Sequence, residues 1–294
     1  MKRRLYTLDV FTTKPYSGNP LAVVTDGDGL TQARMQDIAR EMNLSETVFV
    51  QKPTSDRALA RLRIFTTTRE LPLAGHPVIG TWFLLATLGV VPASSEGNVH
   101  VMQQTGAGIL PVELTFRDGR PALVTMTQKP ARFAPAKLNR AKLAAALGLK
   151  PSDFDARLPL EFVSTGIFNL MVPIKRRASL GRIHINMRAL AQLISRGGVM
   201  AYCFALDGNG RAFARGMLPW GLVEDPATGS AAGSLAAYLV RNERLRERQT
   251  LVIEQGIEMG RPSQIRAEIN AARGRLVPKV SGSAVPILEA HIEA

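Results

Sequence analysis

The sequence predicts two similar domains that each combine strands with helices, an α/β chain by composition. The chain has 294 residues, enough for two domains of about 100 to 200 residues each. Hydrophobic residues make up 46% and charged residues 21%, which is typical of a globular protein. The third observation is an internal repeat, because the same succession of strand, turn and helix patterns occurs in both halves.

The repeat consists of four pairs of segments that follow one another in the same order. The pairs are 18–24 with 165–172, 63–65 with 211–213, 75–77 with 225–230, and 104–108 with 255–260. Between the halves, Pro130 and Pro135 bracket a polar and basic piece that we take as the boundary. We therefore expect an N-terminal domain at residues 1–130 and a C-terminal domain at residues 131–274.

Strand patterns begin the first half at residues 5–11 and 21–24, and a turn rich in proline and glycine joins them. Thr31 then caps a segment with apolar residues at helical spacing. This helix should stop near Asn43.

A second helix is predicted after a loop that ends in Gly75 and His76. Pro77 is suited to the first helical position, with residues 78–85 as the body of the helix. Further along, residues 117–120 have the Asp-Gly pair typical of a hairpin turn.

In the second half, Asn139 should cap a helix over 141–147 that ends at Gly148. An apolar run at 201–206 predicts a buried strand that holds Cys203. Cys203 is the only cysteine, so an internal disulfide and any mechanism with two thiols from one chain are excluded.

The charge balance of 37 Lys and Arg against 24 Asp and Glu gives a net charge of +13. This charge suits a small anionic substrate, and it also suits nucleic acid. The basic residues are spread along the chain, and aromatic residues make up only 6%, so we expect no nucleic-acid partner.

No run of 18 apolar residues occurs, and Asp9 interrupts the apolar stretch after the basic start, so we expect a cytoplasmic protein with no membrane partner. The four histidines are scattered without metal-ligand spacing, and no glycine-rich phosphate loop is present. We therefore expect no metal and no cofactor.

Three segments are candidates for a site. Asp225 and Ser230 flank a loop of small residues before an apolar helix, and the N–H groups of such a first turn can hold an anion. His76 lies at the other helix start, where it can exchange a proton near neutral pH. Glu46 directly precedes a strand pattern. The alternatives at these positions are an ordinary helix cap, a packing histidine and a solvated carboxylate.

If a pseudo-two-fold axis relates the domains, the two helix N-termini should face each other across an interdomain cleft. Two positive dipole ends would then hold one carboxylate from two sides.

Four motifs together resemble the PhzF-like phenazine-biosynthesis isomerase family. They are Asn43-Leu44-Ser45-Glu46-Thr47, Arg69-Glu70-Leu71-Pro72-Leu73-Ala74-Gly75-His76-Pro77, Glu224-Asp225-Pro226-Ala227-Thr228-Gly229-Ser230-Ala231, and 255–263. The resemblance implies an α+β fold like that of diaminopimelate epimerase. In that fold, two pseudo-symmetric domains each curl a mainly antiparallel sheet around a central helix. It also implies a homodimer without a cofactor, and a last strand from about 275–294 that joins the first domain.

The resemblance also assigns roles to individual residues. Glu46 matches the catalytic carboxylate that moves a proton between two carbons of a cyclic amino or hydroxy carboxylate, as in dihydro-hydroxyanthranilate-type chemistry. His76 and Asp225 match residues that orient the substrate and assist proton transfer. The matches that hold the substrate carboxylate are Gly75, Gly229, Ser230 and Ala231.

Two alternatives stay open. The first is an amino-acid-type epimerase or racemase that uses Glu46 with His76 or Asp225 as acid and base on opposite faces. In two-thiol epimerases of this fold, cysteines occupy the loop positions that here carry His76 and Asp225, which argues for isomerisation. The second alternative is a basic binding protein that keeps the fold without turnover.

Overall fold

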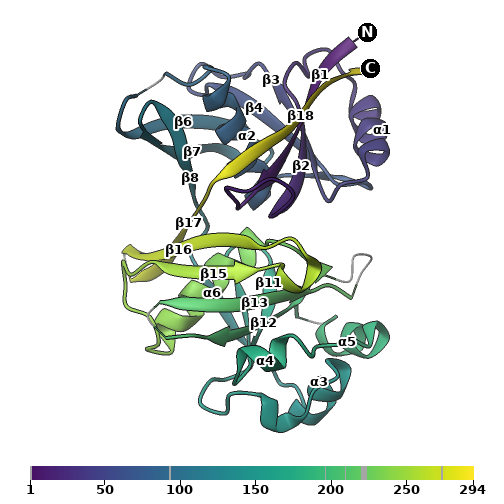
Figure 1. Cartoon of the computed structure of the whole chain (residues 1–294), viewed down its shortest axis with the longest axis vertical. Coiled ribbons are helices and arrows are strands. Elements are labelled where there is room, and N and C mark those ends of the chain that lie inside the picture. Colours follow the sequence, from purple (N-terminus) through teal and green to yellow (C-terminus); the bar gives the residue numbers. More distant parts are fainter. Residues whose placement is uncertain (1, 93, 196, 209, 220–223, 273) are drawn as a thin grey trace. The chain divides into compact units, whose positions relative to one another are not determined.

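The computed structural model describes residues 2–92, 94–195, 197–208, 210–219, 224–272 and 274–294. The chain forms two compact units (Figure 1). Unit 1 comprises Met1–Met126 and Ser281–Ala294, and unit 2 comprises Thr127–Val280. The second unit thus begins a few residues before the boundary expected from composition. Residues 275–280 belong to unit 2, and only the remainder of the C-terminal segment joins unit 1.

Unit 1 is a mixed, mainly antiparallel sheet in the pairing order β18–β1–β2–β3–β4–β6–β7, with β8 paired to β7. Its strands are β1 (Lys2–Val10), β2 (Asn19–Val24), β3 (Thr47–Gln51), β4 (Ala60–Phe65), β5 (Glu70–Leu71), β6 (Gly97–Thr105), β7 (Gly108–Arg117), β8 (Arg120–Thr127) and β18 (Ala284–Glu293). The last strand lies antiparallel to the first, so the two ends of the chain are neighbours in this unit (Figure 1).

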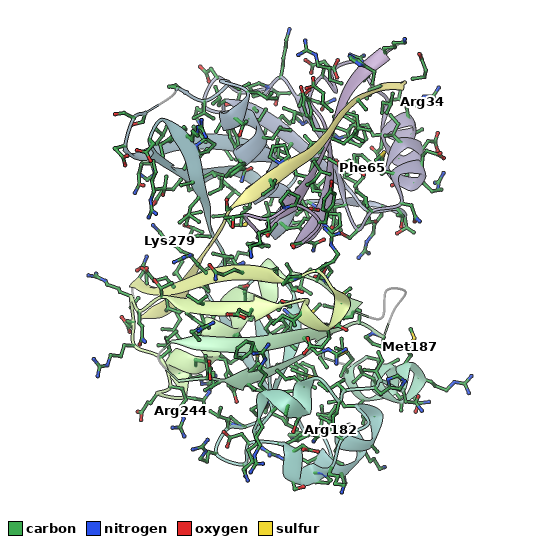
Figure 2. The ribbon with its side chains drawn as sticks, viewed as in Figure 1. Arg34, Phe65, Arg182, Met187, Arg244 and Lys279 are labelled. Atoms are coloured by element: carbon green, nitrogen blue, oxygen red, sulfur yellow. The ribbon has the colours of Figure 1, made fainter. Side chains whose placement is uncertain are left out.

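Two helices connect the parallel strand pairs of unit 1, α1 (Gln32–Met42) and α2 (Gly75–Thr87). α1 begins after the predicted cap Thr31 and ends at Asn43, which adopts the left-handed conformation. α2 is buried on almost every side, and it contacts β1, β2, β3 and β18. A helix that is hydrophobic all round must be covered by other elements, and here the sheet of unit 1 covers it. Trp82 in α2 is fully buried. Phe65 in β4 is buried in the cluster that includes Met35 and Ile38 of α1 (Figure 2).

Unit 2 has a similar order of paired strands, β9–β10–β11–β12–β13–β15–β16. Its strands are β9 (Arg132–Pro135), β10 (Glu161–Ser164), β11 (Phe168–Pro173), β12 (Ala201–Leu206), β13 (Arg211–Met217), β14 (Glu224–Asp225), β15 (Leu251–Gln255), β16 (Ser263–Ala272) and β17 (Arg275–Gly282). Its helices are α3 (Arg140–Ala146), α4 (Arg177–Leu180), α5 (Met187–Ile194) and α6 (Gly229–Arg241), with 3₁₀ turns η1 (Pro151–Asp153) and η2 (Ile257–Met259).

The central helix of unit 2 is α6, which contacts β10, β11 and β16. Its buried face consists mostly of Gly, Ala and Ser, because neighbouring groups come close to its backbone. A Cβ atom on Gly233 would lie 1.9 Å from Gln128 Oε1. Both units therefore surround one buried helix with a mainly antiparallel sheet.

The register of the strands shows which residues of the two halves are equivalent. Phe65 pairs with Thr47 and Glu70 in unit 1, as Met217 pairs with Ala201 and Glu224 in unit 2. The pairing of 63–65 with 211–213 is therefore wrong, and the counterpart of 63–65 is 215–217. The error arose because an Arg-x-Phe pattern occurs at both 63–65 and 211–213, whereas only register along the sheet fixes equivalence.

Local caps and turns elsewhere in the chain lie where the sequence predicts them, with one exception in α2. Asn139 caps α3, Gly148 follows it at φ +67°, and Asp118 and Gly119 form the turn between β7 and β8 with positive φ. Pro77, however, is the third residue of α2, because the helix already begins at Gly75. Gly75 and His76 are thus part of the first turn.

The surface of both units carries the basic side chains. Arg34, Arg182 and Arg244, which lie far apart in the sequence, are all exposed (Figure 2). Among the residues that the structure describes, no helix has the length and apolar character needed to span a membrane.

We predict that Gly256→Ala destabilises the protein more than Gly260→Ala. Both glycines have positive φ, +76° and +69°, so alanine at either position costs about 1–2 kcal/mol of backbone strain. At Gly256 the new Cβ would also lie 2.4 Å from Arg261 O and 2.7 Å from Pro226 O, whereas nothing lies within 4 Å at Gly260. Urea unfolding measures both changes, and equal losses would contradict the packing of η2 against the loop before α6.

Candidate active site

Glu46 and His76 lie together in unit 1. Glu46 follows the left-handed end of α1 and directly precedes β3, while His76 is the second residue of α2. His76 Nε2 is 3.4 Å from Glu46 Oε2, and the two side chains are 8% and 17% exposed. The structure thus brings the predicted acid/base carboxylate and the predicted histidine into contact.

Burial raises the pKa of Glu46, and a hydrogen bond from Ser45 opposes the shift. Oε2 of this carboxylate is inaccessible to water and makes no hydrogen bond of good geometry among the described residues. A carboxylate in this environment exchanges its proton closer to neutral pH, as a general acid/base requires.

Gly75 begins α2 after Ala74, whose side chain cannot cap the helix. The partial positive charge of a helix N-terminus and its N–H groups favour an anion at this position. Gly75, His76 and Glu46 therefore combine a desolvated carboxylate with a helix turn that favours an anion.

Asp225, Gly229, Ser230 and Ala231 lie together in unit 2, at β14 and the first turn of α6. Thr228 precedes the helix, and its side chain does not cap the helix. Instead, Thr228 Oγ1 donates a hydrogen bond of 2.6 Å to Asp225 Oδ2.

Two side chains from outside α6 bind the carbonyl groups of this first turn. Gln128 Nε2 donates to Gly229 O at 2.9 Å, and Thr165 Oγ1 donates to Ser230 O at 3.1 Å. Since a carbonyl group points toward the C-terminal end of its helix, these contacts fix the turn without using its N–H groups.

An arginine–glutamate pair holds each loop that leads into a central helix. In unit 2, Arg215 Nε and Nη2 donate to Glu224 Oε1 and Oε2 at 2.8 and 2.7 Å. In unit 1, Arg63 Nε and Nη2 donate to Glu70 with the same two distances. Glu224 and Glu70 each lie five residues before the first residue of the helix, so the two bidentate pairs are equivalent parts of the repeat.

Sequence reasoning assigned no role to Arg63, Arg215, Thr228 or Gln255. Gln255 belongs to one of the family motifs. A glutamine buried in a strand indicates a hydrogen-bond network, because its amide has four hydrogen-bonding positions that must be satisfied. The arginine–glutamate pairs could have been found by aligning the halves on Glu70 and Glu224.

Metal-binding side chains and the single cysteine are the other candidates for chemistry. Among the side chains that the structure describes, no group of three His, Cys, Asp or Glu residues is arranged to hold a metal ion. Cys203 is fully buried in β12, as predicted, and burial raises the pKa of its thiol to about 12. It is therefore unsuited to nucleophilic or acid/base work at neutral pH.

Solved structures establish the fold class. The chain superposes on a PhzF-family phenazine biosynthesis protein from Bacillus anthracis with a TM-score of 0.89 and 28% identity, covering 100% of both chains. It also matches a predicted epimerase from Pseudomonas aeruginosa with a TM-score of 0.80 and 33% identity over 99% of both chains. A probable proline racemase from Agrobacterium radiobacter shares the fold, with a TM-score of 0.71 and 15% identity over 99% of this chain and 93% of that chain.

A curated relative adds an activity class. The chain is 38% identical to trans-2,3-dihydro-3-hydroxyanthranilate isomerase from Pseudomonas aeruginosa over 289 residues, 97% of this chain and 98% of the relative. The fold and this similarity define an isomerase with the fold shared by diaminopimelate epimerase and proline racemase. Residues 8–290 match the PhzC-PhzF model of phenazine biosynthesis-like proteins, and the chain belongs to that family.

We predict that Glu46→Gln changes how stability depends on pH. The folded-state pKa of Glu46 is raised, so the folded protein binds this proton more tightly than the unfolded chain. The contribution of Glu46 to stability is therefore present below the unfolded pKa of about 4.3 and is lost as pH rises through the raised folded pKa. Urea midpoints between acidic and neutral pH should show Glu46→Gln gaining on the wild type as pH rises.

Exposed Glu41 on α1 supplies the matched control, because Glu41→Gln removes a nearby carboxylate that is already solvated. If Glu46→Gln and Glu41→Gln follow the wild type in parallel at every pH, the carboxylate of residue 46 is not desolvated.

We predict that the two arginine–glutamate pairs differ in strength. Arg215→Met leaves Glu224, 9% exposed, without its partner and should cost about 3–5 kcal/mol of unfolding free energy. Arg63→Met should cost less, because Glu70 is 30% exposed and water can replace the arginine. Double-mutant cycles with Glu224→Met and Glu70→Met measure both couplings, and a larger coupling in unit 1 would contradict this ranking.

Proposed function

We propose that this isomerase moves a proton and a double bond in a small, cyclic amino or hydroxy carboxylate, with Glu46 as the acid/base that carries the proton. The observation that carries the proposal is the desolvated carboxylate of Glu46, 3.4 Å from His76 at the first turn of α2. A single carboxylate that takes a proton from one carbon and returns it to another suits a shift on one face of a ring. No cofactor is needed for such a transfer.

His76 and Asp225 orient the polar groups of the substrate and assist the transfer in this proposal. Gly75, Gly229, Ser230 and Ala231 hold its carboxylate and stabilise the negative charge that develops. The first turns of α2 and α6 support this role, since neither helix is capped by the side chain that precedes it. The reaction of the trans-2,3-dihydro-3-hydroxyanthranilate isomerase relative supports this substrate class.

Family resemblance also supports a homodimer that acts in the cytoplasm on a small anionic substrate. The second candidate function is an epimerase or racemase, which the likeness to a predicted epimerase favours. In that reaction, Glu46 and either His76 or Asp225 would act on opposite faces of one carbon. Membership of an isomerase family sets aside the binding protein without turnover.

We predict that the protein converts trans-2,3-dihydro-3-hydroxyanthranilate in deuterated water with a shifted double bond, and that deuterium enters the new C–H position only when the Glu46 proton exchanges with solvent before it is returned. Glu46→Gln should lower kcat by about 10²–10⁴, the usual contribution of a general acid/base. In the wild type, kcat/KM should fall on the acid side as Glu46 becomes protonated, at a pH above that of an ordinary glutamate. NMR spectra of the product and initial rates measure these quantities, with Glu41→Gln as the control.

Two results would decide against the proposal. A Glu46→Gln variant with the wild-type rate would remove the acid/base role. A stereocentre inverted with deuterium at the same carbon and no bond shift would establish the epimerase instead.

A further inference from the structure

Gln255, at the end of β15, is fully buried, and its side-chain amide contacts the loop that carries Asp225. Gln255 Nε2 donates to Asp225 O at 2.7 Å and to Thr228 Oγ1 at 3.0 Å. Gln255 Oε1 accepts from Thr228 N at 3.2 Å and from the Tyr202 hydroxyl at 2.8 Å. All four hydrogen-bonding positions of the amide are therefore used.

The partners of Gln255 determine which way its amide points. Thr228 N can only donate, so it requires the amide oxygen, and Asp225 O can only accept, so it requires the amide nitrogen. Burial raises the pKa of Tyr202, with the charge of Asp225 adding to the effect, so the Tyr202 hydroxyl stays protonated and donates. No flipped orientation satisfies these groups.

The orientation of the amide also sets the direction of the next hydrogen bond. Because Gln255 Nε2 donates to Thr228 Oγ1, the single hydroxyl proton of Thr228 is left for Asp225 Oδ2 at 2.6 Å. We propose that Gln255 is a positioning residue, which holds the Asp225 carboxylate in place for the isomerase reaction by fixing the Thr228 hydroxyl as its donor. This inference rests on the proposed function of Asp225.

Packing around the network leaves little room for another arrangement. A Cβ atom on Gly216 would lie 3.1 Å from Thr228 Oγ1 and 3.2 Å from Gln255 Nε2. Ser263 Oγ is within hydrogen-bonding distance of Pro226 O and Gln255 O, at 3.0 and 3.1 Å. The Gln255 side chain thus contacts Asp225 and Thr228, and Ser263 links the Gln255 backbone to Pro226.

Unit 1 carries a different residue at the position of Gln255. Ala60 pairs with Gln103 as Ala212 pairs with Ile253, which makes Thr105 the counterpart of Gln255. Gly106 and Gly256 follow them, and each comes close to the proline of its own loop, Pro72 or Pro226. The amide network therefore goes beyond what the duplicated scaffold requires, which points to a role specific to Asp225.

The test uses the full-length protein and the deuterium assay, with two variants that change the network in different ways. Gln255→Glu replaces the donor nitrogen with an acceptor oxygen. The Thr228 hydroxyl can then donate its proton to this oxygen instead of to Asp225 Oδ2. Thr228→Val removes that proton in a side chain of similar shape. Each should lower kcat by about 10- to 100-fold with little change in KM, since a small misplacement of a group that acts in the transition state is costly.

Three further variants make the result specific. Thr228→Ser keeps a hydroxyl and should recover most of the kcat that Thr228→Val loses. Tyr238→Phe removes another buried hydroxyl bond of unit 2, to Pro159 O at 2.6 Å, and should leave kcat unchanged. In an Asp225→Asn background, Gln255→Glu should have no further effect, because both changes act through one carboxylate.

The inference would be overturned if Thr228→Ser lost as much kcat as Thr228→Val. A normal kcat in folded Gln255→Glu or Thr228→Val would also overturn it. Additive losses in the Asp225→Asn background would also overturn it. Failure of the proposed function is distinguishable, because Asp225→Asn or Glu46→Gln would then retain full activity by itself.

Discussion

A bidentate arginine–glutamate pair fixes each of the loops that precede α2 and α6. The geometry of the candidate site depends on these two pairs. A loop that presents catalytic groups must be held to well under an ångström, which loop backbone cannot achieve by itself. Arg63 with Glu70 and Arg215 with Glu224 supply that restraint at equivalent positions in the two units. In unit 2, Arg215 Nη1 also donates to the carbonyl oxygens of Leu180 and Ile183, so the pair is joined to α4 and the turn after it.

On this duplicated scaffold, the chemical groups are not duplicated. Strand register makes Met200, which is buried, the counterpart of Glu46. Likewise, the register gives Gln255 a threonine as its counterpart in unit 1. The repeat therefore preserves the central helix, the paired strands and the arginine–glutamate pair, while Glu46 belongs to unit 1 and the amide network of Gln255 belongs to unit 2.

Much of this organisation could be predicted from the sequence, because caps, turns and apolar periodicity act locally. Thr31, Asn139 and the Asp118-Gly119 turn are examples in which a few neighbouring residues decide the backbone. The register of the repeat could not be predicted, because strand pairing joins residues far apart and short patterns such as Arg-x-Phe recur by chance. For the same reason, sequence reasoning proposed Glu46 and His76 without their 3.4 Å contact, and it assigned no role to Gln255.

The environments of the two acidic side chains differ in a way that bears on their roles. Glu46 is buried beside His76, and desolvation favours its protonated form, which suits a group that must take up and release a proton. Asp225 instead accepts a short hydrogen bond from Thr228, whose donor direction is set by Gln255. A carboxylate that already accepts a fixed hydroxyl proton is suited to orienting a substrate rather than to carrying protons. The different roles that we propose for the two residues thus rest on the hydrogen-bond donors around each carboxylate, since the residue types alone would permit either role.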